Sequence, residues 1–170
     1  MELNVAKELK LVGRVSEACL QQEYPVVELS GRSIRLTLPV TVEVRYYFDG
    51  EGFCLSGQLS SAAAMNCTKC NEEFIEPFSV DFSERFLRVG EKEADLLDCY
   101  PYSGEVLSLD KMVQDLIVLN APVYGLCKPD CKGLCPVCGT NLNYTQCSCT
   151  ALDDGNPFAV LKGLADLLND

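Results

Sequence analysis

The sequence predicts an α+β protein: an antiparallel β-meander, folded as a sheet or partly open barrel, plus a small helical, cysteine-rich zinc module. Three observations support this. Apolar and polar residues alternate over much of residues 35–86, apolar spacing typical of a helix follows residue 108, and eight of the eleven cysteines form four close pairs. We therefore expect an antiparallel β domain, 1–107, and a module of helix, four-cysteine zinc knuckles and C-terminal helix, 108–170.

The β domain is predicted from three runs of alternating residues. The first run, 35–48, has one apolar face made of Leu36, Leu38, Val40, Val42, Val44, Tyr46 and Phe48. The Asp-Gly-Glu-Gly sequence at 49–52 is a strong turn signal, and the second run, 53–59, continues through small residues toward Cys67. The third run has Phe78, Val80, Phe82 and Phe86 in register. Long strands would place the C-x2-C pair at a hairpin tip, the half-site geometry of a zinc ribbon or knuckle.

Two helices are predicted in the second half of the chain. After an acidic linker, 91–107, Ser108 can cap a helix whose apolar stripe is Leu109, Met112, Val113, Leu116 and Ile117. Asp110 complements the dipole of the first turn, and Asn120-Ala121-Pro122 ends the helix. Asn156-Pro157 announces the last helix, with the apolar face Phe158, Leu161, Leu164, Ala165 and Leu168.

The composition argues against several classes of protein. The chain has no histidine, so it contains no Ser-His-Asp triad, Cys-His dyad, H-E-x-x-H metalloprotease motif or histidine-ligated catalytic zinc. The formal net charge is −11, which disfavours a broad electrostatic grip on phosphate backbones. We predict a protein that is not an enzyme and takes no small-molecule substrate.

The chemistry expected of the cysteines depends on whether the protein resides in a reducing or an oxidising compartment. The N-terminus has charges spread through it and no apolar core of signal-peptide length, and no segment has the roughly 18 apolar residues that span a bilayer. A cytoplasmic address without membrane association follows, where cysteine clusters are usually metal ligands or catalytic thiols. An odd count also fits poorly with a fully paired disulfide framework. Three solitary cysteines are predicted to be buried small hydrophobic residues: Cys19, Cys54 and Cys99.

The remaining cysteines have the spacing of metal ligands. Short spacing lets two thiolates reach one ion at about 2.3 Å each. Eight thiolates suffice for two closed tetrahedral sites, which predicts two structural Zn²⁺ ions, with iron–sulfur and disulfide chemistry as alternatives. The simplest division makes one local site from Cys135, Cys138, Cys147 and Cys149. The other four, Cys67, Cys70, Cys127 and Cys131, would then clip the C-terminal module to the hairpin tip.

Three stretches resemble the YceD-type proteins of bacteria and plastids, also called large ribosomal RNA subunit accumulation proteins. They are CTKC with its aromatic-rich strand, YPYSGEVLSLDKMVQDLIVLNAPV, and LCKPDCKGLCPVCGTNLNYTQCSC with the following NPFAVLKGL. The resemblance covers most of residues 36–165. It implies a role in accumulation or processing of large-subunit ribosomal RNA and no defined catalytic activity. It carries over Cys67, Cys70, Cys127 and Cys131, with the other four paired cysteines as an extended set that some family members lack.

The region around the cysteines is poor in acids, because residues 116–152 contain one acid, Asp130. Candidate RNA or partner contacts there are Lys128, Lys132, Asn141, Asn143 and Tyr144. A plainer interpretation stands beside this one: the lysines screen thiolate charge and the asparagines form turns. We expect a non-enzymatic, zinc-binding ribosome-biogenesis factor for 23S rRNA that works through ribosome-assembly or RNA-processing proteins, with ribosomal RNA contact weak or local. A redox-sensing, chaperone-like zinc switch is the alternative.

Overall fold

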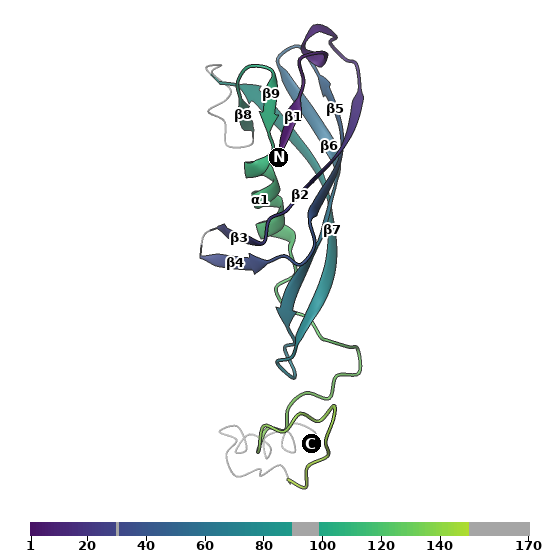
Figure 1. The fold of residues 1–170 in the computed structure, drawn as a ribbon, viewed down its shortest axis with the longest axis vertical. Helices are drawn as coiled ribbons and strands as arrows, with labels where there is room; N and C mark the ends of the chain where they lie inside the picture. The colour runs from purple at the N-terminus through teal and green to yellow at the C-terminus, as the bar shows by residue number, and fades with distance from the viewer. Residues whose placement is uncertain (30, 90–98, 150–170) are drawn as a thin grey trace, which may run out of the picture.

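The computed structural model describes residues 1–29, 31–89 and 99–149 (Figure 1). The predicted last helix lies outside these residues. The elements, in chain order, are β1 (Glu2–Asn4), a short 3-10 turn (Glu8–Lys10), β2 (Ser16–Gln22), β3 (Val26–Leu29), β4 (Arg32–Arg35), β5 (Val40–Phe48), β6 (Gly52–Asn66), β7 (Glu73–Arg88), β8 (Tyr100–Tyr102), β9 (Val106–Ser108) and α1 (Asp110–Asn120). The described chain is therefore mostly β, as predicted.

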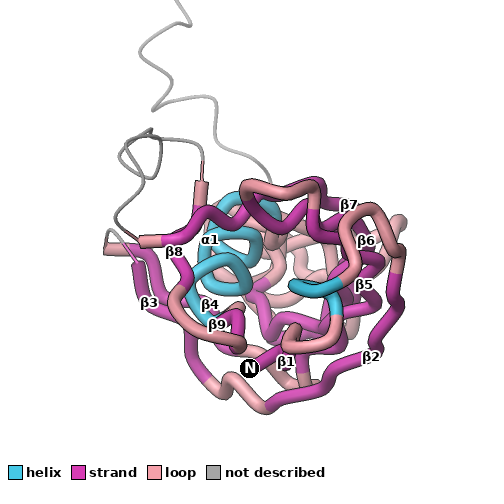
Figure 2. Tube along the Cα trace, turned by 90° about the horizontal axis from the view of Figure 1, so that it is seen from above, coloured by secondary structure: helices cyan, strands magenta, loops and turns pink. Residues whose placement is uncertain are grey.

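The main sheet has five strands in the order β2-β5-β6-β7-β8. Its centre is one long hairpin, in which β6 and β7 pair from Gly52↔Leu87 down to Asn66↔Glu73. Two small two-stranded sheets, β1-β9 and β3-β4, accompany it. Seen from above, β2, β5, β6 and β7 form a curved wall with α1 on its concave side (Figure 2). The long hairpin projects its tip away from this core (Figure 1).

The sheet differs from the predicted meander in one respect: it is mixed. Strand β8 runs parallel to β7, with Phe86 opposite Tyr100. The connection between these strands is too long for a hairpin turn, and a longer connection lets the chain return to the same end of the sheet. The predicted acidic linker, 91–107, therefore contains two short strands. The buried side chains of Tyr102 and Leu107 hold them against the core, which local composition does not reveal.

The first predicted strand is interrupted. Residues 35–48 form the end of β4 and the whole of β5, with Pro39 between them. Proline has no N–H for the strand ladder, so the alternation breaks there, and the side chain of Leu38 is 56% exposed. Helix α1 is confirmed, but it has no side-chain cap from Ser108. Asp110 instead accepts hydrogen bonds from the N-terminal ammonium of Met1 and from the Tyr24 hydroxyl.

One hydrophobic core lies between the inner face of the sheet and α1. The predicted alternation is confirmed in β5, where Val40, Val42 and Val44 are buried. From β6 and β7 the core takes Phe53, Leu55, Leu59 and Phe86, and from α1 it takes Met112, Val113, Leu116 and Ile117. Each such side chain contributes about 1.5–3 kcal/mol to the free energy of unfolding. The packing fixes the end of α1 and so directs the following segment toward the hairpin tip.

The segment after α1 contains no helix over its described residues, 121–149. The sequence predicted knuckles here, between two helices of which the second lies outside the described residues, and the segment consists mainly of turns. Prolines interrupt it at positions 122, 129 and 136, and each removes a backbone donor that a helix would need. The short cysteine spacings require turns in any case, because paired sulfurs must point to the same place.

Candidate metal centre

The loop at the hairpin tip, 67–72, turns two cysteine side chains to one side. The backbone N–H of Cys67 donates to the carbonyl of Glu72 at 2.8 Å, and the N–H of Asn71 donates to the carbonyl of Cys67 at 2.8 Å. Asn71 adopts the left-handed conformation, with φ of 60°, which asparagine tolerates better than most residues. Cys67 and Cys70 are both buried in this turn.

A second turn repeats this geometry further along the chain. The N–H of Cys135 donates to the carbonyl of Thr140 at 2.8 Å, and the N–H of Gly139 donates to the carbonyl of Cys135 at 2.9 Å. Gly139 has φ of 73° at the position equivalent to Asn71. The two C-x2-C motifs therefore form the same knuckle, with a left-handed residue directly after its second cysteine.

The segment after α1 returns to the hairpin tip and brings two further thiols to the first knuckle. The backbone N–H and the hydroxyl of Thr68 both donate to the carbonyl of Gly125, at 3.0 and 3.1 Å. The Cys67 and Cys131 sulfurs are then 3.7 Å apart, and those of Cys70 and Cys127 are 3.5 Å apart. The sulfurs of these four residues, the first quartet, all lie within 4.8 Å of one another.

The second quartet consists of Cys135, Cys138, Cys147 and Cys149, whose sulfurs also lie within 4.8 Å of one another. It is more open than the first quartet, since Cys138 and Cys149 are exposed. The structure thus brings the eight cysteines together in the two groups that their spacing suggested. That these thiols are metal ligands stays a prediction.

Each quartet fits one tetrahedral metal ion of its own. A tetrahedron with metal–sulfur distances of about 2.3 Å has sulfur–sulfur edges of about 3.8 Å. The two measured separations in the first quartet, 3.7 and 3.5 Å, are close to this value. They are far longer than the roughly 2.05 Å of a disulfide bond, and all eleven cysteines are free thiols. Four convergent thiols are the donor set that zinc or iron prefers.

The electrostatics of the quartets also favour a cation. Burial opposes ionisation of Cys67, but backbone N–H groups, led by that of Cys127, outweigh it and lower the pKa of this thiol to about 6. The hydroxyl of Thr140 leads the contacts that lower the pKa of Cys138 to about 6. Neighbouring thiols shift the other way: the side-chain hydrogen bond with Cys138, together with burial, raises the pKa of Cys149 to about 12. In each quartet some thiols have a lowered pKa and others have a raised pKa. A bound divalent cation favours ionisation of all four thiols, because its charge stabilises neighbouring thiolates.

The residues predicted to contact RNA or a partner lie around the first quartet. Lys128 and Lys132 are exposed, and Tyr144 is 74% exposed while its hydroxyl donates to a carboxylate oxygen of Glu72. Asn141 and Asn143 are half-buried, and the Asn143 amide donates to the Asn141 side chain at 2.9 Å. Their role as contacts stays a prediction.

Glu72 is a residue whose part in the site the sequence analysis missed. Its carboxylate accepts from Tyr144 at 3.2 Å and from the Cys70 thiol at 3.6 Å. The one signal in the sequence that could have identified Glu72 was its position two residues after Cys70. None of the three solitary cysteines is buried as predicted, and Cys99 is half-buried. Cys19 is exposed because it lies opposite Glu43 on the outer face of the sheet, and Cys54 is half-buried with its thiol donating to Asp49.

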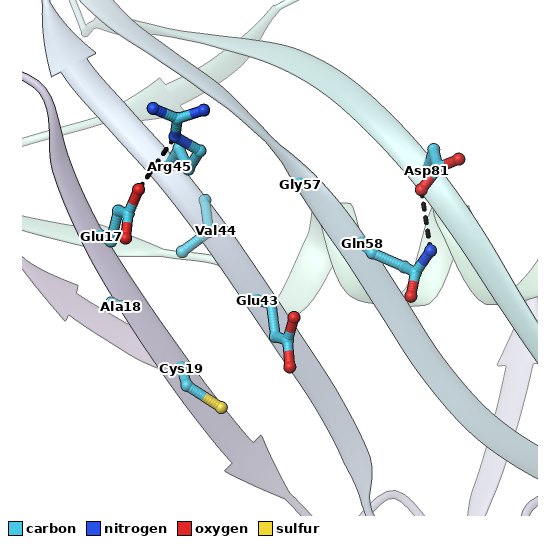
Figure 3. A pocket seen from close by; sticks show the side chains of 9 residues that line it. All are labelled: Glu17, Ala18, Cys19, Glu43, Val44, Arg45, Gly57, Gln58 and Asp81. Carbon is cyan, nitrogen blue, oxygen red and sulfur yellow. Dashed lines mark hydrogen bonds and ion pairs between the residues drawn. The ribbon is translucent and has the colours of Figure 1, made fainter.

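The outer face of the sheet carries a shallow groove of about 660 Å³ (Figure 3). Gly57 lies in its floor, where a β-carbon would come within 1.9 Å of the Glu43 carbonyl oxygen. Arg45 pairs with Glu17 at 3.0 Å and Gln58 donates to Asp81 at 3.0 Å, so the groove is acidic and its side chains bind one another across strands. No described helix is long and apolar enough to cross a membrane.

Comparison with known proteins connects the region of the two quartets to a family. The family model described as large ribosomal RNA subunit accumulation protein YceD matches residues 55–165, which include both quartets. A protein of Arabidopsis thaliana named large ribosomal RNA subunit accumulation protein YCED homolog 1, chloroplastic, is 22% identical over 79% of this chain and 55% of its own length. The Zea mays protein of that name is 41% identical over 30% of this chain and 17% of its own length.

A more distant relative is an uncharacterized protein of Mycobacterium bovis, 24% identical over 59% of this chain and 50% of its own length. The chain thus spans about half the length, or less, of these curated relatives. No solved structure matches the chain.

Proposed function

Since the chain belongs to the YceD family of large ribosomal RNA subunit accumulation proteins, we propose that it is a non-enzymatic, zinc-binding ribosome-biogenesis factor. It supports the accumulation or processing of 23S rRNA. The observation that carries the proposal is the pair of cysteine quartets inside the matched region, one of which ties the segment after α1 to the hairpin tip. In this proposal the protein presents a surface to its partners, and the bound metal stabilises the conformation of that surface.

Each quartet holds one structural Zn²⁺ in this proposal. Zinc supplies charge that four thiolates can share, and four thiolates complete its tetrahedral coordination. A closed site leaves no position for a water molecule or a substrate, so it has no catalytic role of the kind known for open zinc sites. The groove of Figure 3 offers no alternative centre, because its charged and amide side chains bind one another across the strands.

The partners are proposed to be ribosome-assembly or RNA-processing proteins. A chain with a net charge of −11 attracts basic proteins and repels phosphate backbones over most of its surface. Any contact with ribosomal RNA is local and involves the exposed side chains near the first quartet, Lys128, Lys132 and Tyr144. An aromatic ring and two cations are suited to stacking on a base and neutralising a phosphate.

The proposal is tested in cells that lack the protein. We expect precursors of the large-subunit RNA to accumulate and large subunits to be depleted in ribosome profiles. The wild-type protein and a Cys19→Ser variant should restore the profile, because Cys19 lies outside both quartets, whereas Cys67→Ser/Cys70→Ser should not. Unchanged ribosome profiles in the deficient cells would contradict the proposed role.

A pull-down at native protein level identifies the partners. Salt weakens contacts with phosphates and contacts between an acidic chain and a basic protein alike. The capture is therefore made at low salt, with and without ribonuclease, and we expect protein to be captured in both cases. Capture of ribosomal RNA alone would contradict the assignment of protein partners.

The exposure of Cys138 and Cys149 favours a second candidate, a redox-sensing zinc switch. In this candidate two thiolates of the second quartet reduce hydrogen peroxide to water with two protons, form a disulfide and release their zinc. Mild peroxide should then release one zinc per chain and induce holdase activity toward an unfolding client protein. Retention of both zincs would exclude the switch and leave the first proposal standing.

A further inference from the structure

The two quartets are in contact through a loop. Residues 139–146 connect the two cysteine pairs of the second quartet, and in the middle of this loop the amide nitrogen of Asn143 donates to the Cys131 sulfur at 3.3 Å. The side-chain oxygen of Asn143 accepts from the backbone N–H of Lys132 at 2.9 Å. A side chain that belongs to the loop of one quartet is thus fixed against a thiol of the other.

The same loop touches the opposite side of the first quartet. The hydroxyl of Tyr144 donates to Glu72 at 3.2 Å, and the thiol of Cys70 donates to the same carboxylate oxygen of Glu72 at 3.6 Å. Asn143 therefore contacts a thiol of the first quartet directly, whereas Tyr144 contacts Glu72, which in turn contacts Cys70 of the other cysteine pair. Loop 139–146 therefore lies against the first quartet.

Backbone hydrogen bonds hold loop 139–146 close to the first quartet. The N–H of Leu142 donates to the carbonyl of Gly133 at 2.9 Å, and the N–H of Leu134 donates to the carbonyl of Lys69 at 3.1 Å. Gly133 has φ of 76°, and a β-carbon there would be 3.1 Å from the Lys69 carbonyl oxygen. The second quartet's loop, the chain between the quartets and the hairpin tip thus form one continuous hydrogen-bonded unit.

The shape of the loop depends on its ends, which are Cys138 and Cys147 of the second quartet. A metal in the second quartet ties these ends together and removes most of the conformational freedom of the residues between them. Asn143 is then already placed where it donates to Cys131. Hydrogen bonds to ligand atoms stabilise their negative charge and fix their orientation, and loss of one typically costs about 10–100-fold in metal affinity.

We propose that the two cysteine quartets bind their metal ions cooperatively, and that loop 139–146 carries the coupling through Asn143 and Tyr144. Both are positioning residues for the first quartet, since they act on its thiols and are not ligands. This inference rests on the part of the proposed function that assigns one zinc to each quartet. Coupling between binding sites is reciprocal, so zinc in the first quartet strengthens binding in the second by the same factor.

The test is a zinc titration of the full chain in competition with a chromogenic chelator, under reducing conditions. Each quartet is measured alone in a variant that lacks the other: Cys147→Ser/Cys149→Ser for the first and Cys67→Ser/Cys70→Ser for the second. We expect each isolated quartet to bind zinc about 10–100-fold more weakly than it does in the intact chain. Circular dichroism of the β-sheet checks that each variant is folded.

Asn143→Ala should weaken the first quartet by a similar factor in the intact chain and have little further effect in Cys147→Ser/Cys149→Ser, where the loop is already released. Tyr144→Phe, which removes a single hydroxyl, should show the same pattern to a smaller extent. Gln146→Ala is the matched control: its exposed side chain belongs to the same loop and makes no hydrogen bond with the described residues, so zinc affinity should not change.

Two zincs that bind with the same affinity in the presence and absence of the other quartet would overturn the coupling and leave the zinc assignment intact. An Asn143→Ala effect of equal size in both backgrounds would also overturn it, because Asn143 would then act without the second quartet. A chain that binds no zinc would overturn both the coupling and the zinc assignment.

Discussion

Removal of metal from both quartets is expected to release residues 121–149 from the hairpin tip while the β core stays folded. This segment has no helix among its described residues. Apart from the contacts made by sulfur, four hydrogen bonds join it to the loop 67–72: two from Thr68 to Gly125, one from Leu134 to Lys69 and one from Tyr144 to Glu72. The core buries its side chains between the sheet and α1, and among the described residues Phe74 packs against both this core and the first quartet.

The magnitudes show which interaction dominates. A net contribution of about 0.5–1.5 kcal/mol per hydrogen bond gives roughly 2–6 kcal/mol for the four that join the segment to the tip. A structural zinc contributes about 10–16 kcal/mol. The metal therefore stabilises the attached state several-fold more than these hydrogen bonds do. Loss of even about 3 kcal/mol raises the population of the released segment roughly 100-fold.

Limited trypsin digestion with and without a chelator, in reducing buffer, measures this population. Lys132 is the reporter, because its side chain is exposed and its backbone N–H is held by Asn143. Cleavage at Lys132 should accelerate at least about 100-fold on chelation, since cleavage of a transiently opened segment follows the open population. Arg45 is the internal control, because β5 is paired on both sides and its backbone should resist in either state.

Two results would refute the reasoning. Equal cleavage at Lys132 with and without chelator would mean that hydrogen bonds and packing suffice to hold the segment. Simultaneous loss of protection at Lys132 and Arg45 would mean that the β core depends on the metal, contrary to the expectation that it stays folded.

Two further predictions concern the β domain. Gly57→Ala should lower the free energy of unfolding by about 1–3 kcal/mol in urea titrations, because the new β-carbon would lie 1.9 Å from the Glu43 carbonyl oxygen and backbone must move; Ser56→Ala is the control, and an unchanged midpoint would contradict the close approach. The second prediction is that protonation of Asp49 lowers the stability of the folded protein in acid. Burial raises the pKa of Asp49, but the N–H groups of Gly52 and Glu51 and the Arg85 guanidinium outweigh burial and lower it. The stabilisation is therefore complete above the unfolded pKa of about 3.9 and is lost as pH falls through the lower folded value. Asp49→Asn should abolish this part of the pH dependence, and an unaltered acid profile would count against it.

Local periodicity predicted much of the fold. The alternation in β5 and β6 and the helical stripe of α1 are each confirmed, since burial of one face imposes a repeat that a short window of sequence displays. The parallel strand β8 and the pairing of β1 with β9 were not predicted. Strands of three residues are too short to show a period, and their partners lie far away in the chain.

For the site, the sequence by itself determined which thiols are available and that they form four pairs, because thiols spaced by one to three residues can serve a common centre. The tertiary structure decided which pairs meet in each quartet. Only the tertiary structure decided what surrounds them. The contacts of Asn143 with Cys131 and of Tyr144 with Glu72 join residues 12 and 72 positions apart. The second exists because the segment after α1 returns to the hairpin tip, and the first because hydrogen bonds within that segment fold loop 139–146 back against Cys131. Such contacts depend on where the chain ends up in space, and no local pattern of residue types encodes that.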